Sequence, residues 1–189
     1  MKKISASLTL LLFILTSCNT KAPINLGFTA GLTGRNATLG VDGRDGAILA
    51  IETINAQGGV AGRPLALVTE DDRGTAEGAI AADRALIDAN LTAVIGHMTS
   101  DASIASWPTV KDSGMVFLSP TVSTPQLAGF KDNFFRLIVI NAYPAAALAE
   151  YASQELKLQK VVIFYDNDNI AFTGTYRDGF TVPFENKGG

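Results

Sequence analysis

The sequence predicts an α/β fold of the doubly wound kind, built around a parallel sheet. Short apolar runs rich in β-branched or bulky residues alternate with longer segments whose apolar residues recur at helical spacing. The links between them are short, and right-handed crossovers between such elements make the strands parallel. The runs that we predict to be strands are 24–28, 65–69, 91–96, 115–118, 134–140 and 160–165.

Five segments with helical character lie between or after these runs. Gly58-Gly59 stops the first of them. Proline removes a backbone donor, so we expect Pro108 to kink the third segment and Pro183 to kink or split the last. The predicted helices extend over 41–57, 75–90, 101–112, 141–158 and 172–187.

The N-terminal residues 1–18 have the pattern of a secretory signal peptide. Two lysines precede an apolar run, 8–15, that is too short to span a bilayer. The closing Leu-Thr-Ser-Cys resembles a bacterial lipobox, in which the cysteine is diacylated and becomes the new N-terminus. We therefore predict a lipid on Cys18, followed by a short tether over 19–23. An ordinary signal peptide that happens to end near a cysteine is the alternative.

Composition narrows the possible partners. The chain has 189 residues, 47% hydrophobic and 17% charged, which is ordinary for a globular protein with one core. Without the signal peptide it carries 13 basic and 18 acidic side chains, a balance that argues against nucleic acid. A single cysteine and a single histidine exclude an internal disulfide and argue against a zinc site. We expect no metal and no cofactor.

The stretch 93–127 holds the strongest candidate site. Two predicted strands end in it, and the carboxyl ends of parallel strands meet at the sheet edge where ligands bind. Helix starts that follow such strands offer backbone N–H groups to a carboxylate. Small hydroxyl residues come at both ends, namely Thr99 and Ser100 after the first strand, and Ser119, Thr121, Ser123 and Thr124 after the second.

A plainer interpretation of these hydroxyl residues is that they only cap helices. Ser123 and Gln126 have capping-box spacing, and Pro125 suits a first helical turn. From the residues alone, both interpretations of the stretch stay open.

Other patterns in the chain carry less chemistry. Gly31, Gly34 and Gly40 follow the first predicted strand but lack the spacing of a phosphate-binding loop, so we expect a plain glycine-rich turn over 30–40. His97 closes a strand without a nucleophile–base pair, and no catalytic set is present. The acidic turn 70–73 could bind a cation, but we expect a solvated loop with a local ion pair. Trp107 is expected to pack on the sheet.

Several segments together resemble the substrate-binding proteins of ABC transporters of the branched-chain amino-acid type, which have the type I periplasmic binding fold. The resemblance covers nearly everything from residue 24 onward, and its combined spacing is more specific than any one piece. The matching segments are AILAIETINAQGGVAGR (47–63), LVTEDD (67–72), VIGHMTS (94–100), LSPTVSTPQL (118–127), NFFR (133–136) and KVVIFYDND (160–168).

In that family two α/β lobes close on a small ligand. The resemblance implies that residues 24–140 are the first lobe and that 141–189 are the beginning of a second, incomplete lobe. It also implies an exported, periplasmic or cell-surface protein, held at the membrane through Cys18, that passes an amino acid or similar carboxylate to an ABC permease. The alternatives are a ligand-sensing domain of a receptor or regulator and, with less support, an exported hydrolase.

The resemblance matches four residues of the candidate site to family positions and assigns roles to three of them. Ser100 matches the family's serine that binds the ligand carboxylate through its hydroxyl and neighbouring amides. The Thr121 carbonyl would accept from the ligand ammonium, and Ser123 would contact both the carboxylate and the amine. Val122 lies between them without an assigned side-chain role.

Two further positions would be apolar contacts. Leu39 stands near where leucine binders place an aromatic residue, and Phe172 would be the aromatic residue of the second lobe. The leucine at position 39 departs from the family pattern, and it puts leucine-type specificity in question.

Overall fold

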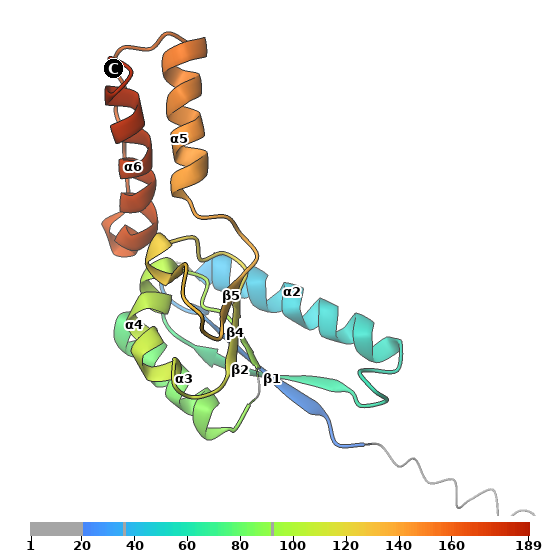
Figure 1. Ribbon diagram of the computed structural model, residues 1–189. Helices are drawn as coiled ribbons and strands as arrows, with labels where there is room; N and C mark the ends of the chain where they lie inside the picture. Colours follow the sequence, from blue (N-terminus) through green and yellow to red (C-terminus); the bar gives the residue numbers. More distant parts are fainter. Residues whose placement is uncertain (1–20, 36, 92) are drawn as a thin grey trace, which may run out of the picture.

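The computed structural model describes residues 21–35, 37–91 and 93–189. Its centre is a sheet of five parallel strands in the order β2-β1-β3-β4-β5, which confirms the predicted sheet (Figure 1). The predicted signal peptide and Cys18 lie outside the described residues. The strands are β1 Ile24–Ala30, β2 Leu65–Asp71, β3 Ala93–Ile95, β4 Val116–Ser119 and β5 Phe134–Arg136.

Helices cover both faces of the sheet, as a doubly wound fold requires. Helix α2 lies on one face, and α3 and α4 pack side by side on the other (Figure 1). The pair α5 and α6 projects beyond the sheet, and α6 also contacts α4. Their bounds are α2 Ala37–Ala56, α3 Ala76–Asp88, α4 Ser100–Val110, α5 Ala142–Glu150 and α6 Ile170–Glu185.

Each face of the sheet has its own apolar cluster. Phe28, Ala30 and Met98 are buried together on one side, with Ala47 of α2 packed against them. On the other side, α3 and α4 close over a second set. Trp107 packs there against Phe134 with ring centroids 5.6 Å apart, as predicted. The buried members of that second set are Leu86, Leu91, Val94, Val110, Met115 and Phe117.

Helix α2 starts at Ala37, earlier than the predicted residue 41. Sequence reasoning assigned this part to a glycine-rich turn because of Gly40. Gly40 is instead a buried residue in the first turns of the helix, where an added Cβ would meet the Gly31 carbonyl oxygen at 2.1 Å. This glycine therefore allows α2 to lie directly against the loop that follows β1.

Two predictions about the later elements are wrong, and a third, that Pro183 kinks or splits the last helix, is wrong for the split. The strand expected over 134–140 ends at Arg136, because β4, its neighbour, ends at the residue paired with it, Ser119. Pro183 does not split α6. It lies close to the helix end, and the Asn186 amide still donates to the Val182 carbonyl at 3.1 Å.

The run 160–165 is not a strand in the described part of the chain. Strands need a hydrogen-bonding neighbour, and no described segment pairs with this run. Phe164 is 93% exposed and Val162 78%, although the sequence of the run is apolar. The adjacent helices α5 and α6 instead bury their small core between each other, around Ala149 and Phe180.

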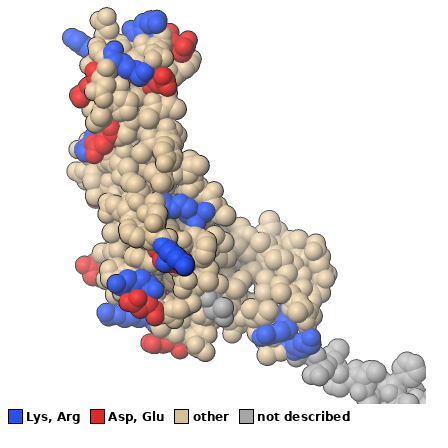
Figure 2. All heavy atoms as spheres, viewed as in Figure 1, with Lys and Arg blue, Asp and Glu red and all other residues tan. Residues whose placement is uncertain are grey.

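Charged side chains are unevenly spread on the face shown in Figure 2. On the projecting part they gather mainly near the tip, and the surface between that tip and the sheet is mostly uncharged. Exposed apolar side chains of this part include Leu148 and Tyr151, together with the run 160–165.

Candidate ligand-binding site

The loops that leave β3 and β4 are fastened to each other at the carboxyl edge of the sheet. The Ser119 hydroxyl donates to the His97 carbonyl at 2.8 Å. The Thr121 hydroxyl donates to the Met98 carbonyl at 2.7 Å. These two bonds bring the first residue of α4, Ser100, and the segment 121–123 to the same edge, as the sequence predicts.

Ser100 and Ser123 each bury a hydroxyl group that has no hydrogen-bond partner among the described residues. Ser100 is 2% exposed and Ser123 is 1% exposed. A buried hydroxyl without a partner costs about 1–3 kcal/mol, so such groups are uncommon in folded proteins. Both hydroxyls therefore keep unused hydrogen-bonding capacity near the carboxyl edge of the sheet.

The capping interpretation does not hold for these two serines. Thr124, not Ser123, caps the 3₁₀ turn Pro125–Leu127, because its hydroxyl accepts from the Gln126 amide at 3.3 Å. The N-cap of α4 is Thr99, and Ser100 is already inside the helix. Neither serine hydroxyl is used to begin a helix.

Thr121 and Val122 hold the loop in place rather than offering side chains to a ligand. The Thr121 hydroxyl already donates to Met98. The Val122 side chain is completely buried, and its amide donates to the Ser119 hydroxyl at 3.1 Å. Any ligand contact in this segment would therefore use backbone groups and Ser123.

Arg136, at the end of β5, holds the loop after β4 through hydrogen bonds to its carbonyl groups. One terminal nitrogen, Nη1, donates to the Thr124 carbonyl at 2.7 Å, and the other donates to the Leu127 carbonyl. Burial lowers the pKa of Arg136 from its ordinary value, and a nearby acidic residue, Asp132, partly opposes this shift. Sequence reasoning did not select Arg136, although a charged residue inside the apolar run 134–140 was the available signal.

Helices α4 and α6 cap each other's first turns across the site. The side-chain oxygen of Asn169 accepts from the Asp101 amide at 3.2 Å. The Asp101 carboxylate accepts from the Ala171 amide at 3.2 and 3.3 Å. Burial raises the pKa of Asp101, while the amides that it accepts from work in the opposite direction. This reciprocal contact joins the first 140 residues to the segment that follows.

Two more contacts connect the same parts. The side-chain amide of Asn141 donates to the Phe172 carbonyl at 2.7 Å. On the surface, Arg35 pairs with Asp168 and lies 3.5 Å from a carboxylate oxygen of Asp166.

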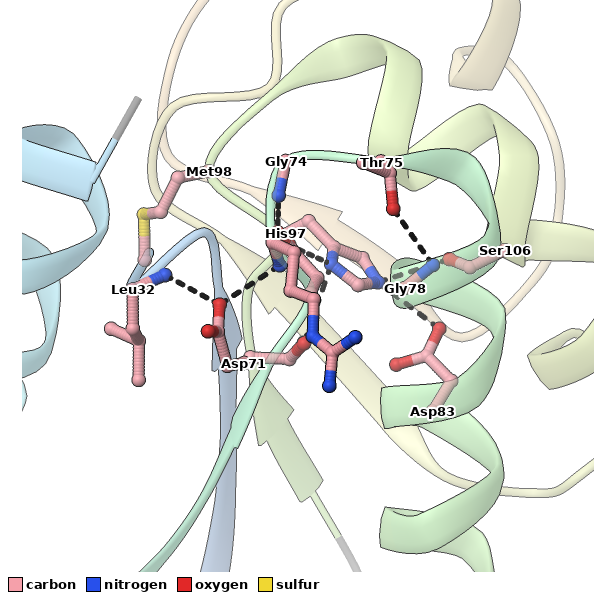
Figure 3. A network of polar contacts seen from close by, with 12 residues as sticks. Leu32, Asp71, Gly74, Thr75, Gly78, Asp83, His97, Met98 and Ser106 are labelled. Carbon is pink, nitrogen blue, oxygen red and sulfur yellow. Dashed lines mark hydrogen bonds and ion pairs between the residues drawn. The ribbon is translucent and has the colours of Figure 1, made fainter. Parts of the chain in front are cut away.

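The acidic turn after β2 is more ordered than the sequence suggested. The Asp71 carboxylate accepts from the Leu32 amide at 2.8 Å (Figure 3). It also accepts from the Thr33 hydroxyl at 2.6 Å and from the Arg73 amide at 2.8 Å. Burial would raise the pKa of Asp71, and these donors together lower it. Asp72 is buried and contacts His97, so the prediction of a solvated loop is wrong for this residue.

Neither a metal centre nor a membrane span emerges from the described residues. Over 21–35, 37–91 and 93–189, no three His, Cys, Asp or Glu side chains are grouped so that they could hold a metal ion. Within the same ranges, every helix is too short or too polar to cross a bilayer.

A model of the periplasmic binding protein family matches residues 23–189. The chain belongs to this family. The parallel sheet and the flanking helices are thus those of a periplasmic binding protein, and the resemblance seen in the sequence is confirmed.

Relatives and solved structures agree on the type. The Leu/Ile/Val-binding protein homolog 3 of Brucella melitensis is 29% identical over 172 residues, 89% of this chain and 45% of that protein. A branched-chain amino acid transporter substrate-binding protein from Streptococcus pneumoniae, solved with isoleucine, is 26% identical with a TM-score of 0.75. That match covers 84% of this chain and 47% of the other.

A third comparison leads to the same type of protein. An ABC transporter substrate-binding protein from Desulfitobacterium hafniense, solved with leucine, is 32% identical with a TM-score of 0.72. It covers 89% of this chain, and this chain covers 48% of it. The periplasmic binding protein described here thus spans about half the length of the relatives that it matches.

The two apolar positions predicted from the family differ in their surroundings. Phe172 is half-buried on α6, 6.3 Å from the Tyr176 ring, beside a cavity of about 320 Å³. Leu39 lies in the first turn of α2 and is 42% exposed. The reciprocal caps bring the start of α6 to α4, whereas no contact described above involves Leu39. Both positions stay predictions.

Proposed function

We propose that the gene product containing this chain is the extracytoplasmic solute-binding component of an ABC importer. Its ligand is an amino acid of the branched-chain type or a similar small carboxylate, held between two lobes. The observation that carries the proposal is the pair of buried, unpartnered hydroxyls of Ser100 and Ser123 at the carboxyl edge of the sheet. The relatives named as Leu/Ile/Val-binding proteins supply the ligand class.

The chemistry of the edge suits the two charged ends of an amino acid. The Ser100 hydroxyl donates to the ligand carboxylate, aided by the partial positive charge at the start of α4. The Ser123 hydroxyl donates to the carboxylate and accepts from the ammonium, and the Thr121 carbonyl accepts from the same ammonium. Val122 contributes packing. No step in this scheme is catalytic, because the protein binds and releases its ligand unchanged.

The remaining contacts come from two sides. In the proposal, residues 24–140 are the first lobe and 141–189 are the beginning of the second. Leu39 and Phe172 supply apolar contacts for the ligand side chain from these two parts. The run 160–165 is apolar and exposed in the described structure, and in the proposal further residues of the second lobe cover it. The half-length coverage of the relatives supports this division.

The proposal includes export and a lipid anchor on Cys18. Residues that follow the predicted signal are held at the amino end of the sheet, where Arg63 donates to the Ala22 carbonyl at 2.8 Å and the Pro23 carbonyl at 3.0 Å. The candidate site is at the opposite, carboxyl edge. A tether leaving from the amino end would therefore keep the ligand edge free to face a permease in the membrane. Metabolic labelling with a fatty acid, lost in Cys18→Ser, tests the anchor.

Calorimetry on the complete gene product tests the ligand. We expect saturable binding of at least one branched-chain amino acid from a panel that also contains polar and acidic ones. Binding of no member of the panel would contradict the assignment. Permease and ATPase genes beside this one would favour transport over a sensing role.

A further inference from the structure

His97 lies in a buried polar network next to the candidate site, in which one oxygen of Asp83, Oδ1, has no partner among the described residues. Its ring nitrogen Nδ1 is 2.7 Å from a carboxylate oxygen of Asp72, and Nε2 is 3.1 Å from one of Asp83 (Figure 3). The Ser106 hydroxyl is 3.0 Å from Nε2, and the Thr29 hydroxyl is 3.4 Å from Nδ1. All five residues are buried.

The network joins every element that packs around the ring. Thr29 comes from β1, Asp72 follows β2, Asp83 is on α3 and Ser106 is on α4. His97 itself is in the loop after β3. These are all the titratable and polar groups that contact the ring in the described residues, and the two carboxylates are the charged ones among them.

The geometry favours a ring that carries a proton on both nitrogens. Each nitrogen faces a carboxylate oxygen, and only the imidazolium form donates from both positions. Burial on its own would lower the pKa of His97, but the hydrogen bonds to Asp72 and Asp83 outweigh it and raise the pKa to about 9. The ring is then an ionic link between β2 and α3, and it has little freedom to shift.

Hydrogen bonds connect the backbone of His97 directly to the candidate site. The His97 carbonyl accepts from the Ser119 hydroxyl, and that hydroxyl accepts in turn from the Val122 amide. On the other side, Ser100 follows His97 by only three residues. Both serine-bearing loops therefore depend on where His97 is held.

The loop has little alternative space. At Gly96, φ is +139°, and an added Cβ would meet the Thr29 carbonyl oxygen at 2.1 Å. The backbone before His97 thus lies directly against β1, so a displaced ring cannot be absorbed by a local shift toward the sheet.

We propose that His97 is the positioning residue of the ligand site, and that its simultaneous contacts with Asp72 and Asp83 hold the loop of Ser100 in register with the Ser119–Ser123 segment. The effect on ligand affinity rests on the proposed function. The effect on the two loops does not, because it can be measured without a ligand.

The test compares Asp83→Asn with Leu86→Val in the complete gene product. Both changes are on α3 and at fully buried residues, but only the first removes the charge of a carboxylate that contacts the ring. We expect Asp83→Asn to shift the amide NMR signals of Ser100 and Val122 and to weaken leucine binding at least tenfold. Leu86→Val should lower the unfolding temperature while leaving those signals and the affinity unchanged. Equal effects of the two variants on affinity and amide signals would overturn the proposal.

A second variant covers the case in which Asp83→Asn does not fold. Ser119→Ala removes the hydroxyl between the His97 carbonyl and the Val122 amide without touching the ring. We expect the Val122 signal to move and the affinity to fall, while the ring keeps protons on both nitrogens at pH 7.5 by ¹⁵N NMR. A ring with one proton at that pH, or an unmoved Val122 signal, would overturn the proposal.

The proposed function and the positioning role of His97 can fail separately. If the wild-type protein binds no amino acid of the panel, the proposed function fails, and the ring protonation and the amide signals still decide the role of His97. If leucine binds but those signals do not respond to Asp83→Asn or Ser119→Ala, only the positioning role is refuted.

Discussion

Replacing Ser100 by alanine should lower ligand affinity without lowering the stability of the unliganded protein. The Ser100 hydroxyl is buried and unpartnered among the described residues, so its removal breaks no intramolecular hydrogen bond. The change also relieves the cost of burying an unpaired polar group, which is on the order of 1 kcal/mol or more. The unfolding temperature without ligand should therefore stay the same or rise.

Affinity should respond in the opposite direction. A hydrogen bond to a charged carboxylate contributes about 1.5–3 kcal/mol. Each 1.4 kcal/mol corresponds to tenfold in Kd, so Ser100→Ala should raise Kd by roughly 10- to 150-fold. Calorimetry with the tightest amino acid of the panel and thermal unfolding with and without it measure both effects on one sample.

Ser103→Ala is the matched control for this experiment. Ser103 is one turn further along α4 and is also buried, with an unpartnered hydroxyl. Its replacement should have a similar effect on unliganded stability and leave Kd unchanged. The reasoning is refuted if Ser100→Ala binds like the wild type, or if it destabilises the unliganded protein by more than about 1 kcal/mol, the worth of an ordinary hydrogen bond.

Three further outcomes follow from the described contacts. The pKa of His97 is about 9 in the folded protein, against an ordinary value of 6.5. The contribution of His97 to the free energy of unfolding is therefore fully present below pH 6.5 and is lost as pH rises through 9. The free energy of unfolding, measured by chemical denaturation, should fall by on the order of 3 kcal/mol across that window. This fall should be absent in His97→Gln, and an equal pH dependence in that variant would contradict the prediction. Asn169→Ala removes the acceptor at the start of α4, so we expect a loss of about 1 kcal/mol and faster hydrogen exchange in that turn; unchanged exchange would show that the cap is dispensable. Gly40→Ala would clash with the Gly31 carbonyl and should destabilise the protein by more than about 2 kcal/mol. Gly46 has open space around it, so Gly46→Ala should stabilise the protein by about 0.5–1 kcal/mol. Similar unfolding temperatures for these two variants would contradict the packing of α2.

Local patterns were sufficient for the core of the fold. Strands that are apolar throughout and helices with one apolar face can each be recognised within a window of about a dozen residues. The parallel direction of the strands and the two covered faces follow from that alternation and from right-handed crossovers, whereas the strand order came from the structure. The placement of Ser100 and Ser123 at one edge follows in the same way, since the edge is set by strand direction.

Other features depended on partners that are distant in the sequence. Whether 160–165 becomes a strand depends on a neighbouring strand to pair with, and its apolar composition does not indicate whether such a neighbour is present. Similarly, Gly40 looks like a turn residue until the loop after β1 lies against it. Pairing and close approach are properties of the assembled chain, so residue preferences alone could not predict either.

The sequence by itself determined that hydroxyl groups line the carboxyl edge of a parallel sheet, and it left open whether they bind a ligand or only cap helices. The tertiary structure decided that Thr124 is the cap and that Ser123 and Ser100 keep unused hydroxyls. It also brought together Asp72, His97 and Asp83 from three separate elements. The reason is physical. A hydrogen bond forms only when its donor–acceptor distance is right to within a few tenths of an ångström, and that distance is set only when all the elements pack together.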